Sequence, residues 1–382
     1  MNSKIITLKE AFDLDVSNGF VVAGDIHLYD FYPYSTRNEG MSSRLIDLKE
    51  TMHEIGLISR MLGLPMILNG DVLHTGILDY YVEFVLTEFL MEYDDVNTFI
   101  NLGNHDIDGG VSVLEPLVNV ARNAKHLVVT KPTKYGISNH STFYFMPYFS
   151  DVQTLAKLKR LIIKINPNVY NTLFIHNSFS GALFANKEQS KHGISQKAAP
   201  LKRFDLVVAS HIHKYQEICN GNGFYTSSLV PLNFGEKSKE HGYHIVDIGN
   251  NIRYFVIPKA PKFIYLRQSI YEALSKQDLT KKVKGNFICI KEDVKDKPIN
   301  KANTRNRLLS CGALFITFKN IITHRLQVKE VKATSENIKD IVASYSSHLA
   351  QEYKLKPKTM QETGLTILTK AEKLVSQKLI RR

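Results

Sequence analysis

The sequence predicts an α/β fold built from layers of helices and strands, followed by a smaller basic region. Two observations support this. Up to about residue 258, short apolar runs rich in β-branched residues alternate with longer amphipathic stretches. The charge then changes sign, because residues 1–258 hold 23 Lys and Arg against 26 Asp and Glu, and residues 259–382 hold 26 against 11. We therefore expect a larger domain at 1–258, a small basic α+β domain at 259–335 and C-terminal helices at 336–382.

Five apolar runs are predicted to be strands of the larger domain. They are residues 20–24, 65–70, 97–103, 171–177 and 206–211. Apolar residues from Leu45 to Leu62 recur at helical spacing, and residues 77–90 predict a largely buried helix. The expected layers are helix, sheet and helix. Pro258 and Pro261 break the pattern where the charge changes sign, which favours a domain boundary there.

Two amphipathic helices are expected at the C-terminal end. Apolar stripes at helical spacing run from Ile338 to Tyr353 and from Met360 to Leu379, with Pro357 between them. Either these stripes pack on the chain itself or they dock on a partner.

The composition excludes several classes of protein. Hydrophobic residues make up 43% of the chain and charged residues 23%, as in an average soluble globular protein. Cys219, Cys289 and Cys311 are far apart and form no CxxC pair, which argues against a disulfide framework or a cysteine zinc finger. No apolar run approaches the roughly 18 residues that a membrane span needs. We expect a cytoplasmic protein without a membrane partner.

Each predicted strand ends in side chains of the types that bind metals. These candidate ligands are Asp25, His27, Asp71, Asn104, His176, His211 and His213. Functional groups of open α/β folds gather at the carboxyl ends of strands. Residues i and i+2 of a strand point the same way, so Asp25 with His27, and His211 with His213, are each expected to serve one site. Carboxylate, amide and imidazole ligands suit manganese, iron or zinc.

The types of these candidate ligands and their order along the sequence predict a two-metal centre bridged by Asp71, with the metals roughly 3.5 to 4 Å apart. Such a centre favours phosphoester hydrolysis, since it holds a phosphoryl oxygen and activates water for in-line attack. His105, beside Asn104, is the candidate to stabilise the transition state or protonate the leaving group, with Asp106 orienting it. The chain has no GxSxG elbow, P-loop or GxGxxG helix start, so acyl-transfer and nucleotide-driven chemistry are not indicated.

Basic side chains of the C-terminal third are candidate DNA contacts. The candidates are Lys281, Lys282, Lys284, Arg305 and Arg307. Such residues neutralise phosphates, the main source of affinity for nucleic acids. From charge alone, an ordinary solvated surface explains them as well.

The motifs GDIH, GDVLH, GNHD, a single His and HIH, in this order, resemble those of the calcineurin-like metallophosphoesterase superfamily over residues 20 to about 258. Protein phosphatases of the superfamily carry GDxVDRG at the second motif, whereas this chain has GDVLHTG. His74 in that motif, and the segment 224–242 with its FGE, are similar to SbcD-type nucleases of double-strand-break repair, including tailed-phage counterparts. Ser210 and Ile175 precede ligand histidines where the family usually has glycine. The resemblance implies a layered β-sandwich flanked by helices.

The resemblance also implies roles for individual residues. One metal would be held by Asp25, His27, Asp71 and His213, and the other by Asp71, Asn104, His176 and His211. His105 and His74 would assist catalysis, and the metals would be manganese. The substrate would be DNA, cut at or near its ends, with residues 259–335 as a DNA-contacting cap and the C-terminal helices docked on an SbcC-type coiled-coil ATPase.

The implied setting is recombination, repair or phage replication, in the cytoplasm or in a host's cytoplasm if the chain is phage-encoded. Two alternatives stay open. One is a phosphatase or small-molecule phosphodiesterase of the same superfamily, and the other is a non-catalytic DNA-binding subunit. The polarity of digestion and the oligomeric state, including a homodimer, are not determined by the sequence.

Overall fold

The computed structural model describes residues 1–120, 125–186, 188–236, 240–293 and 298–321, and the single positions 362 and 366. The chain divides into two compact units, Met1–Ile321 and Ile322–Arg382. The C-terminal helices expected at 336–382, and the last part of the expected basic domain, therefore lie outside the described residues. The domain boundaries at 258 and 335 stay predictions.

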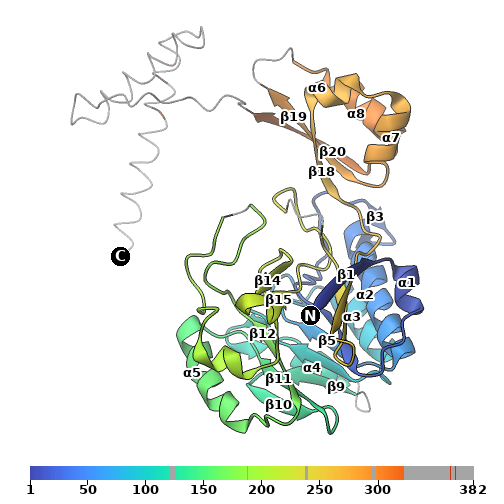
Figure 1. Ribbon diagram of the computed structural model, residues 1–382. Helices are drawn as coiled ribbons and strands as arrows, with labels where there is room; N and C mark the ends of the chain where they lie inside the picture. The colour runs from blue at the N-terminus through green and yellow to red at the C-terminus, as the bar shows by residue number, and fades with distance from the viewer. Residues whose placement is uncertain are drawn as a thin grey trace, which may run out of the picture. The chain divides into compact units, whose positions relative to one another are not determined.

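Two β-sheets pack face to face in the first unit (Figure 1). The seven strands of the first sheet, in spatial order, are β1 (Asn2–Ile6), β17 (Ile252–Val256), β16 (Tyr243–Asp247), β2 (Gly19–Ala23), β5 (Met66–Asn69), β6 (Thr98–Asn101) and β9 (His126–Val129). The six strands of the second are β10 (Thr133–Gly136), β11 (Ser141–Met146), β12 (Tyr170–His176), β13 (Leu206–Ser210), β15 (Gly223–Tyr225) and β14 (Gln216–Ile218). Two short hairpins, β3–β4 (Arg37–Asn38, Met41–Ser42) and β7–β8 (Ile107–Asp108, Val111–Ser112), lie outside these sheets.

The two sheets share an aromatic-rich core. Phe20 and Val22 of β2 contribute to it from one sheet, and Phe143 and Phe174 contribute from the other. The rings of Phe20 and Phe174 meet edge to face, with their centroids 4.9 Å apart. The alternate residues of β2 face a second core under the helices, so both faces of this strand are buried. This is why the sequence of β2 reads as an unbroken apolar run.

The β-sandwich flanked by helices that the resemblance implied is confirmed. The helix–sheet–helix layering expected from the apolar runs is corrected, because a second sheet lies between the helices. The predicted strands are all present, but β2, β5 and β6 belong to the first sheet, whereas β12 and β13 belong to the second. The other strands of the two sheets, such as β10, β11 and β16, were not among the five predicted runs. The first 19 residues, which precede the first predicted strand, form helix α1 (Leu8–Phe12) and the edge strand β1, which pairs with β17.

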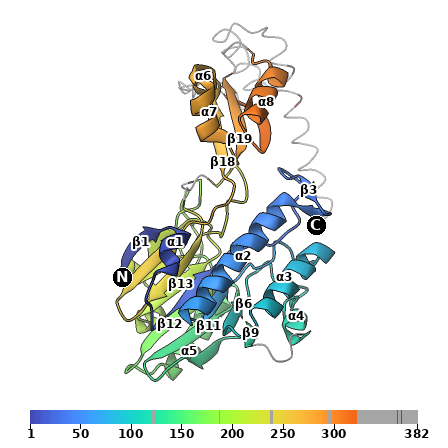
Figure 2. The same ribbon diagram turned by 90° about the vertical axis from the view of Figure 1, so that its right-hand side faces the viewer.

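Helices cover the outer faces of both sheets (Figure 2). Helix α2 (Ser43–Leu62) begins at Ser42, whose side chain accepts from Leu45 N–H, and ends at Gly63 in the left-handed conformation that suits glycine. Helix α3 (Tyr80–Glu92) buries one face only, since Tyr80, Phe84 and Met91 are exposed. It is therefore less buried than expected. Helices α4 (Glu115–Val120) and α5 (Asp151–Leu161) and the short 3₁₀ turns η1 (Ile162–Lys164), η2 (Ala199–Arg203) and η3 (Cys219–Gly221) complete this part of the chain.

A third, parallel sheet follows the linker that contains Pro258 and Pro261. Its strands are β18 (Phe263–Arg267), β19 (Phe287–Asp293) and β20 (Phe315–Ile321), and its helices are α6 (Gln268–Ala273), α7 (Lys276–Val283) and α8 (Lys301–Ser310). The helices pack on the sheet around a hydrophobic core of its own. The first residues of the three strands are aligned phenylalanines, Phe263, Phe287 and Phe315, and the Tyr34 ring packs against all three. None of the helices in the described ranges has the length and apolar character needed to cross a membrane.

Candidate metal centre

The loops that follow five strands bring all seven predicted ligands to one edge of the sandwich. Backbone hydrogen bonds tie these loops together: Asp25 N–H donates to the Gly70 carbonyl at 3.0 Å, and His27 N–H donates to the Asp71 carbonyl at 2.9 Å. His211 N–H donates to the Asp25 carboxylate at 2.9 to 3.0 Å, which joins the loop after β13 to the loop after β2. Ligands from both sheets therefore converge on one site.

Three clusters of donor atoms form within this site, each with all of its atoms within 4.8 Å of one another. They are Asp25 with His27 and His213, His27 with Asp71 and His105, and Asp71 with His176 and His211. Asp71 belongs to two clusters, as the bridging role requires. The first cluster holds three of the four members of one ligand set that the resemblance implied, without Asp71. The third holds three members of the other set, without Asn104.

The backbone reaches this arrangement through left-handed conformations. Asp25, His27, Asp71 and His211 have φ values of 49°, 53°, 50° and 97°. We expected the alternation of side chains along a strand to align these ligands. This explanation was wrong, because these residues follow the strands and the backbone turns sharply at each of them. Left-handed residues other than glycine carry strain that the surrounding structure must hold, and such strain gathers at functional sites.

Close packing at the strand ends explains the glycines of the motifs. A Cβ at Gly70 would lie 2.1 Å from the His176 ring, and Gly70 also has a φ of 84°. A Cβ at Gly24 would lie 2.1 Å from Ser210 Oγ, so glycine there makes room for the serine that precedes His211. Ser210 Oγ in turn accepts from Asn69 Nδ2 at 3.0 Å. Gly24 and Asn69 thus accommodate Ser210 at the position where the family usually has glycine.

Hydrogen bonds donated by Nδ1 fix the orientation of two ligand imidazoles. His176 Nδ1 donates to the Asn69 carbonyl at 3.1 Å, and His213 Nδ1 donates to the Glu236 carboxylate at 2.7 Å. In both rings Nε2 is left to face the site. His213 Nε2 lies 3.0 Å from His27 Nε2, and His176 Nε2 lies 3.3 Å from Asp71 Oδ2. Such outer partners orient ligand histidines and raise their basicity.

Neighbouring charged side chains in the centre shift one another's pKa values. Burial would raise the pKa of Asp71, but the nearby His176 and His27 hold it well below its usual range. Burial would lower the pKa of His176, but Asp71 raises it to about 9. Burial raises the pKa of Asp25 to about 6, against the opposing effect of His213. Because metals bind neutral imidazole, metal binding must displace the proton from His176.

The donor set fits two divalent metal ions. Asn104 Oδ1 is buried and has no hydrogen-bond partner among the described residues. His176 Nε2 is also buried and faces the Asp71 carboxylate without a well-aligned hydrogen bond. Buried polar atoms are normally satisfied, and a metal ligand is one explanation for an exception. The site offers carboxylate oxygens, an amide oxygen and imidazole nitrogens, but no thiolate. Ligand sets of this kind are typical of manganese, iron and catalytic zinc sites.

The predicted catalytic residues lie beside the donor atoms. His105 Nδ1 donates to the His74 carbonyl at 2.6 Å, and its backbone N–H donates to Asp71 Oδ1 at 2.9 Å. Nε2 of His105 is therefore the ring atom free to exchange a proton. The ring of His74 stacks on that of His105 at 5.9 Å between centroids, and its Nδ1 lies 3.3 Å from His27 Nδ1.

Asp106 takes a different role from the one expected. Its two oxygens accept from the N–H groups of Leu73 and Gly103, both at 2.8 Å. The hydrogen bond that orients His105 goes to the carbonyl of His74 instead. Asp106 is fully buried, and it ties together the loops that carry Asp71 and Asn104.

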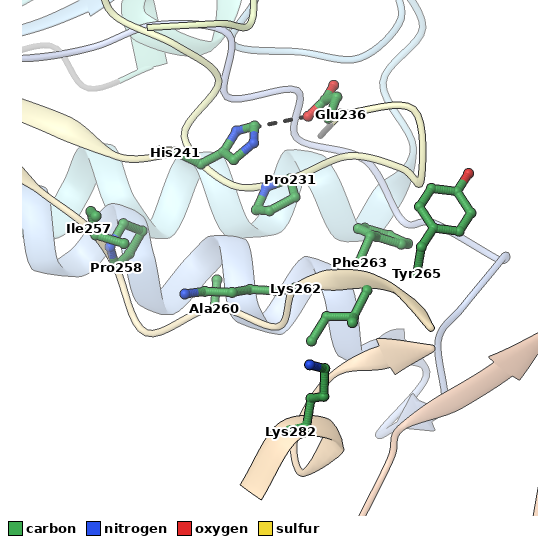
Figure 3. A pocket seen from close by; sticks show the side chains of 11 residues that line it. Pro231, Glu236, His241, Ile257, Pro258, Ala260, Lys262, Phe263, Tyr265 and Lys282 are labelled. Atoms are coloured by element: carbon green, nitrogen blue, oxygen red, sulfur yellow. Dashed lines mark ion pairs between the residues drawn. The ribbon is translucent and has the colours of Figure 1, made fainter. Parts of the chain in front are cut away.

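Two residues of the site were missed in the sequence. Glu236 accepts from His213, from Leu232 N–H at 3.0 Å and from Ser228 Oγ at 3.3 Å. Its place in the FGE segment was a signal that could have identified it. Arg44, at the start of α2, lines the cavity of about 380 Å³ at the metal centre, and no local sequence signal marks it. A second cavity, of about 480 Å³, shares Glu236 and also contains His241, which lies 3.9 Å from the Glu236 carboxylate (Figure 3).

The candidate DNA contacts lie on the third sheet's helices. Lys281 and Lys282 are in the last turn of α7 and Lys284 follows it, and all three are exposed. Arg305 and Arg307 of α8 donate to the backbone carbonyls of Ile316 and Leu274, so both also hold their own domain together. Lys281, Lys282 and Lys284 are therefore the better candidates for contacts with DNA.

A β-sandwich flanked by helices, with Asp, Asn and His side chains gathered at its strand ends, defines a metal-dependent phosphoester hydrolase. Residues 19–215, more than half of the chain, match the model of the calcineurin-like phosphoesterase family, and the chain belongs to this family. It is also similar to a crystal structure of a dimetal phosphatase from Danio rerio, with 9% identity and a TM-score of 0.41, over 61% of this chain and 93% of that chain. No curated protein matches the chain significantly.

Proposed function

We propose that this protein is a manganese-dependent DNA nuclease that hydrolyses phosphodiester bonds at or near DNA ends. The observation that carries the proposal is the basic domain that follows a complete metal centre. Residues 259–321 hold 14 Lys and Arg against 5 Asp and Glu. A basic region appended to a hydrolase is the electrostatic footprint of a nucleic-acid substrate. The resemblance of GDVLHTG and of the FGE segment to SbcD-type nucleases supports the same substrate.

The residues of the centre supply the parts that phosphodiester cleavage requires. Two cations bound there would polarise a phosphoryl oxygen and activate water for in-line attack. His105 would give a proton from Nε2 to the leaving oxygen, and the hydrogen bond from its Nδ1 to the His74 carbonyl supports this role. Glu236 and Asn69 hold His213 and His176 in the ring orientations that the centre uses.

The proposed partner is an SbcC-type coiled-coil ATPase in the same cytoplasmic compartment. The apolar stripes of residues 338–353 and 360–379 support this proposal, because helices that dock in grooves present such stripes.

The proposal is tested on three substrates with the full chain and manganese: end-labelled duplex DNA, closed circular duplex DNA and a chromogenic phosphodiester. Each is assayed with and without the partner ATPase and ATP, and Asp71→Ala serves as the inactive control. Cleavage of linear duplex well above that of circular duplex is the expected result. Hydrolysis of the chromogenic ester without cleavage of either DNA, even with the partner, would contradict the proposal.

A phosphatase or small-molecule phosphodiesterase is the second candidate. The cavity of about 380 Å³ at the centre favours it, since this volume lies within the range of small-ligand sites. In this case the basic residues 259–321 would be a solvated surface. Their charge reversal would then leave every measured activity unchanged.

A further inference from the structure

Arg44 is a charged side chain of the metal cavity that the chemistry above leaves unused. It lies in the first turn of α2, and only 6% of its surface is exposed. It lines the cavity of about 380 Å³ together with His27, Asp71 and His105. Among the described residues that line this cavity, it is the only Lys or Arg.

The contacts of Arg44 leave its charge without a close counter-ion. Nη2 donates to the Leu232 carbonyl at 2.7 Å, and Nη1 donates weakly to the Pro33 carbonyl at 3.4 Å. The guanidinium lies over the Phe31 ring, 3.9 Å from its centroid. All of these partners are neutral, and no ion pair of the described chain includes Arg44. A buried charge is costly unless an opposite charge approaches it.

Arg44 keeps its positive charge although it is buried. Burial lowers the pKa of Arg44 to about 10, against the opposing effects of Glu236 and Asp47, so the side chain remains charged at neutral pH. An anion entering the cavity would therefore meet a cation that is already desolvated.

We propose that Arg44 binds a non-bridging oxygen of the substrate's phosphate group in the metal cavity. The guanidinium offers five N–H donors in a planar fork that matches phosphate, and the contacts to Leu232 and Pro33 occupy only two of them. The phosphate would then contact Arg44 in the same cavity that His27, Asp71 and His105 line. This inference rests on phosphoester hydrolysis at this site, and it holds for DNA and for a smaller ester alike.

A purely structural role is the competing explanation. Arg44 also ties the loop of Phe31 and Pro33 to the loop of Leu232, so its loss could weaken both loops. The two roles differ in one measurable property. A residue that binds the substrate changes the affinity for phosphate while the metals stay bound, whereas a structural residue changes stability or metal content.

The test uses inorganic phosphate as the probe and the manganese-loaded full chain. Phosphate binding is measured by isothermal titration calorimetry for wild type, Arg44→Gln, Arg44→Lys and the control Arg60→Gln. Arg60 lies on the same helix, but it pairs with the exposed Asp95 at 2.6 Å and stacks on Tyr93, away from the centre. Metal content and melting temperature are recorded for each variant.

Arg44→Gln is expected to weaken phosphate binding about 10- to 100-fold, the loss typical of a hydrogen bond to a charged group, with two metals retained. Arg44→Lys should show a smaller loss, since it keeps the charge without the fork, and Arg60→Gln should show none. Unchanged phosphate affinity in Arg44→Gln would overturn the proposal. If Arg44→Gln does not fold or loses metal, Arg44→Lys decides, and wild-type phosphate affinity in that variant overturns the proposal.

The outcome is independent of the DNA substrate. A loss of phosphate affinity in the Arg44 variants, together with a wild-type chain that cleaves no DNA, would support the role of Arg44 and remove the nuclease proposal. DNA cleavage by the wild-type chain, together with unchanged phosphate affinity in the Arg44 variants, would support the nuclease proposal and remove the role of Arg44.

Discussion

Asp71 is the residue on which the two donor clusters depend. Its carboxylate lies 3.3 Å from His176 Nε2 and 3.8 Å from His27 Nε2, so it can serve both metals. We expect Asp71→Ala to lower hydrolysis of a chromogenic phosphodiester by about 10²-fold or more, because charge stabilisation in the transition state is lost. Far-UV circular dichroism should remain native. Asp108→Ala, which removes an exposed carboxylate nearby, is the matched control and should keep full activity.

Replacement of His105 should impair proton transfer and leave the metals bound. The hydrogen bond from position 105 to Asp71 comes from the backbone, so it survives replacement of the side chain. We expect His105→Ala to keep two metals by elemental analysis and to lose about 10² to 10⁴-fold in rate, the usual contribution of general acid–base catalysis. His126→Asn is the control, at a histidine whose Nε2 donates to the Leu90 carbonyl. Loss of one metal in His105→Ala would make His105 a ligand instead.

His244 of β16 should make folding stability depend on pH. Burial and the nearby Arg253 lower the pKa of His244 to about 3, whereas an unfolded histidine titrates near 6.5. The unfolded chain therefore gains a proton first as the pH falls, and the stabilisation that is complete above pH 6.5 is lost toward pH 3. Between pH 7 and pH 5 we expect wild type to lose about 2 kcal/mol more than His244→Gln. Urea unfolding of both chains without added metal measures this, and equal losses would contradict it.

At this scale the sequence predicted which residues meet but not how they meet. The types and order of the seven ligands identified the metal centre, because each strand end carried a distinctive motif. The left-handed turns at Asp25, His27 and His211 could not be foreseen, since they depend on tertiary contacts, such as the hydrogen bonds from Asp25 and His27 to the carbonyls of Gly70 and Asp71. Arg44 was missed for the same reason: a basic residue at a helix start becomes part of the site only through tertiary packing.

Helix α7 is the element on which the DNA proposal can be tested. Lys281, Lys282 and Lys284 are exposed near its C-terminal end, and no ion pair in the described residues involves them. Reversal of the three charges should weaken duplex binding and flatten its salt dependence, with each lost phosphate contact lowering the log–log slope by about 0.9. Hydrolysis of a small phosphodiester should be unaffected.

The control for this experiment is charge reversal at Lys159, Arg160 and Lys164. These residues are exposed on and just after α5, which covers the second sheet. Duplex affinity in the control should stay at the wild-type level. An unchanged salt slope in the α7 variant would identify its lysines as ordinary solvated surface.

Individual elements were easier to predict than their grouping. Strands β2, β5, β6, β12 and β13 are buried on both faces, so each appeared as an apolar run of strand length. Their division between two sheets could not be read from these runs, since strand pairing depends on partners distant in sequence. The exposed face of α3 was misjudged because Tyr80, Phe84 and Met91 are apolar residues that face outward.

At the scale of the whole molecule, the C-terminal segment can be removed as a test of partner docking. The first compact unit ends at Ile321, so a chain ending at Thr334 retains all of it. We expect this shorter chain to stay monodisperse in size-exclusion chromatography and to hydrolyse a small phosphodiester with manganese. It should no longer co-purify with an SbcC-type ATPase. Aggregation would mean that the apolar stripes pack on the protein's own core, and retained binding would place the docking surface elsewhere.

The origin of the ligands in two different sheets has a consequence for opening motions. Asp25, His27, Asp71 and Asn104 follow strands of one sheet, whereas His176, His211 and His213 follow strands of the other. Any fluctuation that parts the sheets at this edge also dismantles the donor set, so its free-energy cost rises with the concentration of free metal. Bound divalent cations would therefore cross-link the two sheets reversibly at this edge, and a lower concentration of free cations would let the edge open more often.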